Sequence, residues 1–303
     1  MPTRTPGLTV GITIPFFDHQ SDYETILGVA RRSEECGYDS VWMADHLSRP
    51  SPQGGSRWFD VVTLLSNIAA HCGRIGIGTD VLVVPYRHPV LAAKMLATLD
   101  VVSGGRLTVG TGVGYIEDEF TDLGAPFAER GPFTTECIQI WKKIWAGGEI
   151  SHRGKFFSFD NLASEHVPAR RPGPPVWIGG TADAVLRRVV EVGDGWHPIY
   201  LPFDVLEAKT RRLHELAERA GREQPISLSY SGGFGSVGTA SADPATRAPL
   251  TGTVDDVLRD VERLRRLGFT NIVFRFGAPD ASNDHVLRQI ELVAERILPA
   301  LRA

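Results

Sequence analysis

Asp45 and His46 lie side by side directly after a short apolar run, residues 39–44, that has the length and composition of a buried β-strand. An imidazole exchanges a proton near neutral pH, and a neighbouring carboxylate can hold it in one orientation. We interpret His46 as a candidate general acid or base, with Asp45 beside it. The alternative is a structural histidine bonded to a backbone carbonyl, and the position at the end of a strand favours the catalytic interpretation.

Two further strand ends are rich in glycine. Residues 75–85 contain Gly76 and Gly78 before Asp80 and Val81, and glycine inside a strand marks a bulge or a close approach of backbone to a ligand. Residues 110–115 continue the pattern with alternate glycines, among them Gly112 and Gly114. They do not match the dinucleotide fingerprint, because no helix follows at once. We expect a ligand to lie against the main chain here.

The segment Gly179-Gly180-Thr181 precedes a helix that begins near Asp183. Unpaired N–H groups and the helix dipole favour an anion at such a place, so the turn is a candidate phosphate site. A tight turn without a ligand is the alternative.

Aromatic residues near other strand ends are candidates for a substrate pocket that accepts an apolar or aromatic molecule. They are Phe16, Phe17, Trp58 and Trp196. Packing at the rim of the fold is the alternative for each of them. Arg275, within the last predicted strand, has the same two interpretations.

Strand-like and helix-like segments alternate along the whole chain. The predicted strands are residues 8–15, 39–44, 74–84, 106–112, 176–178, 195–199, 226–230 and 271–276. The predicted helices are residues 23–36, 60–71, 88–103, 132–146, 183–192, 203–220, 254–267 and 284–301. This order predicts an α/β fold, a (β/α)₈ TIM barrel over residues 1–303 as one domain, with active-site residues at the carboxyl ends of the strands. A doubly wound open sheet is the alternative.

Two stretches exceed an ordinary connection in a barrel. Residues 147–174 form an insertion after the fourth helix, and residues 231–253 form another after the seventh strand. We interpret both as candidate lids over the pocket.

Composition narrows the class of partner. The 303 residues carry a formal net charge of −4, which gives no reason to expect nucleic acid or an anionic membrane, so a small-molecule substrate is the better expectation. No apolar run reaches the length of a membrane span or a signal peptide, and we expect a cytoplasmic protein. Cys36, Cys72 and Cys137 are widely spaced and predict neither disulfides nor a metal site.

Three segments, residues 37–46, 78–89 and 103–114, together with their shared order, resemble the luciferase-like monooxygenase superfamily. These are TIM barrels that bind a reduced flavin or the deazaflavin coenzyme F420. The Asp45-His46 pair resembles the F420-using branch, and the resemblance implies that His46 lies by the deazaflavin ring and transfers a proton. It also implies a non-proline cis peptide at Asp80-Val81 against the ring face.

The same resemblance implies that Gly179-Gly180 holds the cofactor phosphate and that backbone near Gly112 borders the ribityl chain. One departure concerns Val113, which stands where sugar-phosphate dehydrogenases of this branch carry a proton-donating glutamate. That reaction is therefore not expected. Glu117, Asp118 and Glu119 follow shortly after, and solvation or capping of the loop explains them equally well.

The sequence thus predicts an F420-dependent oxidoreductase that transfers a hydride between the deazaflavin and a small organic substrate. The alternative is a monooxygenase that uses reduced FMN from a partner reductase. A barrel that binds such a cofactor without turnover is a third hypothesis. The resemblance further suggests a homodimer.

Overall fold

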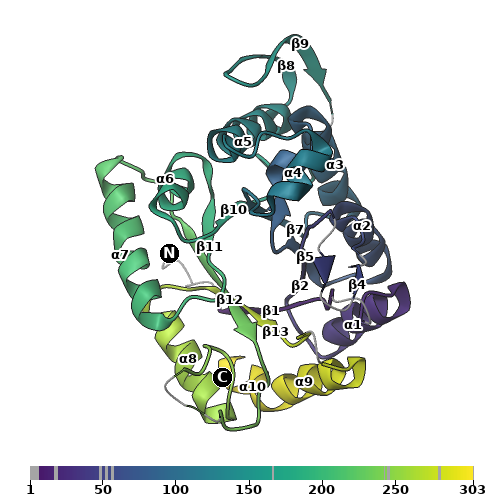
Figure 1. Ribbon diagram of the computed structural model, residues 1–303, viewed down its shortest axis with the longest axis vertical. Helices are drawn as coiled ribbons and strands as arrows, with labels where there is room; N and C mark the ends of the chain where they lie inside the picture. Colours follow the sequence, from purple (N-terminus) through teal and green to yellow (C-terminus); the bar gives the residue numbers. More distant parts are fainter. Residues whose placement is uncertain are drawn as a thin grey trace, which may run out of the picture.

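The computed structural model describes residues 7–16, 20–47, 50–51, 54–55, 58–165, 167–241, 243, 246–278 and 281–302. Phe17, a predicted pocket residue, lies outside these ranges. Eight parallel strands form the centre of the molecule (Figure 1): β1 (Thr9–Thr13), β2 (Ser40–Met43), β5 (Gly76–Thr79), β7 (Leu107–Gly112), β10 (Val176–Gly179), β11 (Gly195–His197), β12 (Ser227–Phe234) and β13 (Asn271–Arg275).

The sheet closes on itself because β10 pairs with β7 on one side and with β11 on the other. The remaining neighbours follow chain order, and β1 pairs in parallel with both β2 and β13. The closed barrel confirms the (β/α)₈ prediction, and the alternative of an open sheet was wrong.

Eight helices surround the strands (Figure 1): α1 (Tyr23–Glu35), α2 (Val61–His71), α3 (Pro89–Val102), α5 (Arg130–Ala146), α6 (Asp183–Val192), α7 (Phe203–Arg219), α8 (Val254–Arg266) and α9 (Asn283–Arg296). Asp22, Asp60 and Ser282 accept a hydrogen bond from the first turn of the helix that follows each of them. Thr253 and Asp256 form a capping box at the start of α8. Local capping chemistry therefore fixes several of the helix starts that the sequence predicted.

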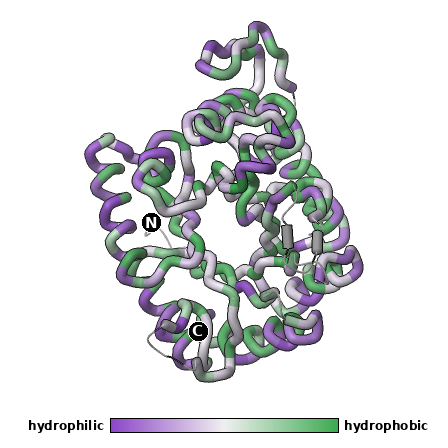
Figure 2. The backbone as a smooth tube through the Cα atoms, in the orientation of Figure 1, coloured by the Kyte–Doolittle hydropathy of each residue, from purple (hydrophilic) through white to green (hydrophobic). Residues whose placement is uncertain are grey.

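The hydrophobic core lies between the strands and the helices. In Figure 2 the outer helices alternate between hydrophobic and hydrophilic residues along their length. In α8, for example, Val257, Val261 and Leu264 are fully buried at a helical spacing. A short helix, α10 (Leu298–Arg302), ends the described chain. None of the helices in the described residues is long and apolar enough to span a bilayer.

Stacked aromatic rings fill the interior of the barrel beneath the carboxyl ends of its strands. Trp42 stacks on Trp177 with ring centroids 5.5 Å apart and on His197 at 5.1 Å. Glycines on the adjacent strands leave space for this indole, since a Cβ atom on Gly78 would lie 2.3 Å from Trp42 and one on Gly11 would lie 2.6 Å from it. The rings form a floor, and the space above them lies toward the carboxyl ends of the strands.

The third strand is interrupted. The sequence predicted one strand over residues 74–84, but the structure has β5, then a cis peptide between Asp80 and Val81, then β6 (Leu82–Val83) and a 3₁₀ turn, η1 (Val84–Tyr86). β6 pairs with β7 alone. The chain approaches β7 so closely at this point that a Cβ atom on Gly110 would lie 2.1 Å from the Thr79 carbonyl oxygen.

The first predicted lid is not one. Within residues 147–174, β8 (Gly148–Arg153) and β9 (Ser158–Ser164) form an antiparallel hairpin that projects beyond α5, away from the barrel mouth (Figure 1). The Glu136 carboxylate on α5 holds the hairpin there by accepting backbone N–H bonds from Phe156 and Phe157. A second short hairpin, β3 (Pro50–Ser51) with β4 (Gly54–Gly55), and a helix that the sequence did not predict, α4 (Glu117–Leu123), lie elsewhere along the chain.

The packing of β5 against β7 predicts that Gly110→Ala destabilises the protein by about 2 kcal/mol or more, because the new methyl group meets backbone that cannot turn away. Gly28→Ala is the matched control. Gly28 is exposed in α1 with open space around it, so alanine should stabilise the helix by about 0.5–1 kcal/mol. Urea denaturation measures both changes, and equal midpoints for the two variants would contradict the close approach at Gly110.

Candidate functional site

A cavity of about 360 Å³ opens above the aromatic floor at the carboxyl ends of the strands. Most of the predicted site residues lie in its walls: Phe16, Asp45, His46, Trp58, Asp80, Val81, Gly112, Gly114, Gly179, Gly180 and Thr181. Arg275, Tyr115, Tyr200 and Phe234 also line it. The structure thus brings together residues from opposite ends of the chain, since Phe16 and Arg275 share one cavity.

Trp196 does not line this cavity, so its assignment to the substrate pocket was wrong. The indole is fully buried in the core beside Phe269, and its Nε1 donates a 2.9 Å hydrogen bond to the Gly180 carbonyl. Successive side chains of a strand point to opposite faces, so Trp196 faces the helices while His197 faces the barrel interior. Trp196 therefore supports the Gly179-Gly180 turn from behind.

The carboxylate of Asp80 is the centre of a fully buried polar network. Its Oδ1 lies 2.9 Å from Nε2 of His197. Its Oδ2 accepts hydrogen bonds from the hydroxyls of Thr13 and Ser231 at 3.0 and 3.1 Å and from Nη1 of Arg275 at 3.1 Å. Burial raises the pKa of Asp80, but the charge of Arg275 and the contact with His197 lower it more, so its net pKa lies below the ordinary value.

Two glycines of the cavity, Gly112 and Gly179, leave space for the side chain of Val81. A Cβ atom on Gly112 would lie 2.5 Å from Cγ2 of Val81, and one on Gly179 would lie 2.8 Å from Cγ1. The Asp80-Val81 peptide is cis, at the position that the resemblance implied. Two glycines that the sequence assigned to a ligand are therefore required by a neighbouring side chain, and they bring that peptide to the cavity wall.

Asp45 does not orient His46. Its carboxylate is buried, pairs with both terminal nitrogens of Arg87 at 2.6 and 3.0 Å, and accepts the backbone N–H of Val83 at 3.0 Å. Arg87 also reaches Asp60, the cap of α2, at 2.7 Å. Asp45 therefore anchors β6 and the turn after it beside the cavity.

The carboxylate that meets His46 belongs to Glu119, on α4. Its Oε2 lies 3.1 Å from Nδ1 of His46 and accepts a short hydrogen bond from the Tyr86 hydroxyl, while Oε1 accepts the backbone N–H of Leu47 at 3.0 Å. The Glu119 side chain is 1% exposed. Burial and the neighbouring carboxylate both raise the pKa of Tyr86, so its phenol stays protonated and donates.

These contacts determine which nitrogen of His46 faces the cavity. Because the backbone N–H and the phenol already donate to Glu119, the carboxylate acts as an acceptor, and we infer that Nδ1 of His46 carries a proton. Nε2 is then the nitrogen available on the cavity side. The acidic run at residues 117–119 was the only signal in the sequence, and it could not show that α4 turns one of its acids inward.

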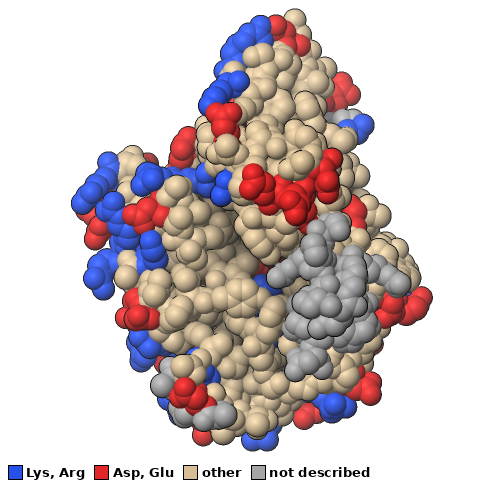
Figure 3. Space-filling view, viewed as in Figure 1, with Lys and Arg blue, Asp and Glu red and all other residues tan. Residues whose placement is uncertain are grey.

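The predicted phosphate turn leads directly into α6. Gly180 has φ of +109°, and Ala182, at the N-cap, has no side chain that could accept the N–H groups of the first turn. Asp183 in that turn pairs with Lys209 of α7 at 2.7 Å, and this hydrogen bond lowers the pKa of Asp183. Lys209 thus offsets the one acid that would repel an anion at the turn. Lys and Arg side chains gather over α7, while acids gather over α4 (Figure 3).

Two buried donors in the cavity wall have no partner in the described part of the chain. They are Nε1 of Trp58 and Nε of Arg275. Trp58 stacks on Phe16 with centroids 4.9 Å apart and lies 4.8 Å from His46. The Arg275 guanidinium lies 4.9 Å from the Tyr200 ring centroid and 5.1 Å from that of Phe234. A buried donor without a partner is unfavourable, so both atoms point to a ligand with acceptor groups.

A parallel barrel with a cavity at the carboxyl ends of its strands, walled by glycines, apolar side chains and a few polar groups, is an enzyme architecture that binds small molecules. A family model described as luciferase-like monooxygenase matches residues 8–271. The chain therefore belongs to the luciferase-like monooxygenase family.

Relatives agree with this placement. An uncharacterized protein of Mycobacterium tuberculosis is 26% identical over 306 residues, covering 93% of this chain and 98% of that protein. The F420-dependent hydroxymycolic acid dehydrogenase of Mycobacterium tuberculosis is 28% identical over 231 residues, covering 75% of this chain and 63% of that protein.

Solved structures share the fold. An F420-dependent secondary alcohol dehydrogenase in complex with an F420-acetone adduct superposes with a TM-score of 0.82 at 17% identity, covering 98% of this chain and 100% of the other. The oxygenating constituent of 3,6-diketocamphane monooxygenase from Pseudomonas putida, in complex with FMN, gives a TM-score of 0.75 at 17% identity, covering 97% and 98%. At this identity the likeness shows the fold alone.

We expect Glu119→Ala to change the protonation pattern of the His46 ring, because it removes the acceptor at Nδ1. Nitrogen NMR of protein labelled at histidine should report a proton on Nδ1 of neutral His46 in the native protein and a mixture of tautomers in the variant. Glu117→Ala, an exposed change on the same helix, is the control and should leave the signals unchanged. Identical spectra for the native protein and Glu119→Ala would refute the inferred tautomer.

Proposed function

We propose that this protein is an F420-dependent oxidoreductase that transfers a hydride between the deazaflavin and a small organic substrate. The observation that carries the proposal is the pair of His46 and Glu119, which presents one imidazole nitrogen to the cavity. The aromatic wall of this cavity suits a flat ring, and its Gly179-Gly180-Thr181 turn suits a phosphate. The F420-dependent relative among the curated proteins supports the choice of cofactor.

The residues present fit a flavin-type cofactor. A tricyclic ring system carries carbonyl oxygens and ring nitrogens, and these are the acceptors that Nε1 of Trp58 and Nε of Arg275 lack. The Asp80-Val81 peptide would lie against the ring, and the Gly179-Gly180-Thr181 turn would hold the phosphate. Gly112 and Gly114 would border the chain that joins them.

When bound, F420 would supply hydride chemistry at its C5 atom, which no side chain provides. His46 would exchange the accompanying proton with the substrate oxygen through Nε2, while Glu119 fixes the ring and stabilises the imidazolium that forms on protonation. Phe16, Trp58 and Tyr115 would shield the reacting atoms from water. Although burial raises the pKa of Asp80, Arg275 and His197 lower it below the ordinary value, so Asp80 would stay ionised within its network.

A monooxygenase that uses reduced FMN from a separate reductase is the second candidate. The barrel suits it equally, and Val113, in place of the glutamate of the sugar-phosphate dehydrogenases, argues only against sugar-phosphate oxidation. The phosphate turn serves FMN as well as F420. A cofactor-binding barrel without turnover remains as the third candidate. Cofactor preference separates the first two, and turnover separates both from the third.

Parallel titration of the purified protein with F420 and FMN at fixed ionic strength tests the proposal. We expect F420 to bind at micromolar concentration or tighter and FMN to bind far more weakly. The exposed cations over α7 should favour the oligoglutamate tail of F420, and added salt should therefore weaken F420 binding more than FMN binding. A preference for FMN would overturn the proposal in favour of the monooxygenase.

The role of His46 predicts a second result. His46→Ala should lower turnover by about 10² or more while cofactor affinity stays within about tenfold, because a positioned acid or base acts mainly in the transition state. His214→Ala, on the exposed face of α7, is the control and should leave turnover unchanged. Parallel loss of cofactor binding and turnover in His46→Ala would assign the residue a structural role.

A further inference from the structure

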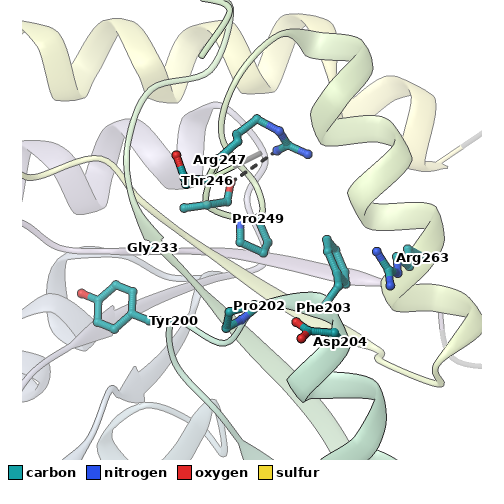
Figure 4. Close-up of a pocket in the computed structure, with 10 residues that line it drawn as sticks. Tyr200, Pro202, Phe203, Asp204, Gly233, Thr246, Arg247, Pro249 and Arg263 are labelled. Carbon is teal, nitrogen blue, oxygen red and sulfur yellow. Dashed lines mark hydrogen bonds between the residues drawn. The ribbon is translucent and has the colours of Figure 1, made fainter. Parts of the chain in front are cut away.

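A second hollow, of about 530 Å³, lies near the ends of β11 and β12 and shares the wall residue Tyr200 with the cavity. Figure 4 shows the residues that line it. We call it the side chamber. Its described walls come from the segment after β11, from the start of α7, from β12, from the insertion after β12 and from α8. They include Tyr200, Pro202, Phe203, Gly233, Ala248 and Pro249. The second predicted lid, residues 231–253, therefore forms part of this wall.

The side chamber borders the cavity. Tyr200 lines both hollows, and β12 lies between them, with Gly233 facing the chamber and Phe234 facing the cavity. The Tyr200 ring, 46% exposed, lies 5.8 Å from that of Phe234. Tyr200 also has φ of +61°, a left-handed conformation that is uncommon for residues other than glycine. A single aromatic side chain therefore stands where the two hollows meet.

The chemistry of the chamber favours an uncharged ligand. Arg247 is engaged by both oxygens of Asp260 at 2.6 and 2.8 Å. Arg263 is engaged by Glu207 at 2.6 Å and lies over the Phe203 ring at 4.5 Å. Both cations have their charge balanced within the protein, and Asp204 adds a negative charge at the edge. An anionic group would find no unpaired cation among the described wall residues, whereas the walls formed by prolines, alanine and phenylalanine suit hydrocarbon.

The size of the first cavity leaves little room for a substrate beside a bound cofactor. A space of about 360 Å³ lies at the small end of the range for ligand pockets, and a tricyclic cofactor would occupy much of it. A substrate that reacts beside His46 must then extend toward a free wall. The side chamber is such a space, and a substrate that extends into it would pass the Tyr200 ring.

We propose that the side chamber binds the apolar part of an elongated, uncharged alcohol or ketone whose reacting carbon lies beside His46. The inference rests on the proposed function for the identity of the reacting group. It assigns the chamber to the substrate and places specificity for chain length in residues 246–249, outside the reacting centre.

Binding of straight-chain 2-ketones, from acetone to 2-dodecanone, tests the proposal through the fluorescence of the native protein with and without F420. Each added methylene should tighten binding by about fourfold until the chamber is full. Ala248→Trp, which fills the chamber, should abolish the gain for the longer ketones and leave acetone and F420 binding unchanged. Ala208→Trp, on the exposed face of α7, is the matched control and should behave as the native protein does.

Thr246→Trp, at the exposed rim of the chamber, provides a second variant if Ala248→Trp does not fold. It should also weaken the binding of the longer ketones. Chain-length dependence that is the same in the native protein and in a folded chamber variant would overturn the proposal. The result of the F420 titration is independent of this test. A chain-length effect that disappears when the chamber is filled supports the assignment of the chamber to an apolar ligand, even if F420 does not bind.

Discussion

A single buried carboxylate, that of Asp80, organises the upper part of the barrel. Its charge lies where water cannot reach, and a buried charge is tolerated only when it is paired and hydrogen-bonded. The partners come from four other strands or strand ends: Thr13 of β1, His197 of β11, Ser231 of β12 and Arg275 of β13. Asp80 thereby ties the interrupted third strand to the opposite wall, and it holds Arg275, whose Nε has no partner among the described residues, in the wall of the cavity.

The charged side chains near Asp80, namely Asp45, Arg87 and Glu119, are also paired or hydrogen-bonded within the protein. Asp45 and Arg87 join the end of β2 to the turn after β6. Of the two adjacent residues in the sequence, Asp45 therefore has a structural role, whereas His46 is the candidate reactive group. Glu119 supplies the acceptor for His46 from another loop. The reactive imidazole is therefore positioned by a residue 73 places away along the chain, and its environment depends on how α4 packs.

Much of this architecture follows from local rules. The alternation of strands and helices predicted the barrel, because each segment shows the period of one structure and many helix starts carry a capping residue. The sequence also placed His46, Trp58 and the glycine turns at the correct face. It failed where the outcome depends on tertiary packing. Trp196 faces outward because successive residues of a strand alternate in direction and His197 faces inward. The inward position of Glu119 could not be predicted, because α4 forms in a segment whose sequence shows no clear helical period. The long insertion after α5 became a hairpin because Glu136 binds its backbone.

The contacts of Val81 bear on how such a chain can vary. Its two methyl groups fill the space where side chains at residues 112 and 179 would otherwise stand, so the identity of one residue dictates that of two others on different strands. A change to alanine at position 81 would open room for a methyl group at residue 112, whereas one at residue 179 would still lie 3.1 Å from the Thr111 carbonyl oxygen. The reverse order of changes passes through a collision with Val81 at both positions. Residues 81, 112 and 179 therefore form one unit of sequence variation, and the order in which they are substituted decides which evolutionary paths remain open.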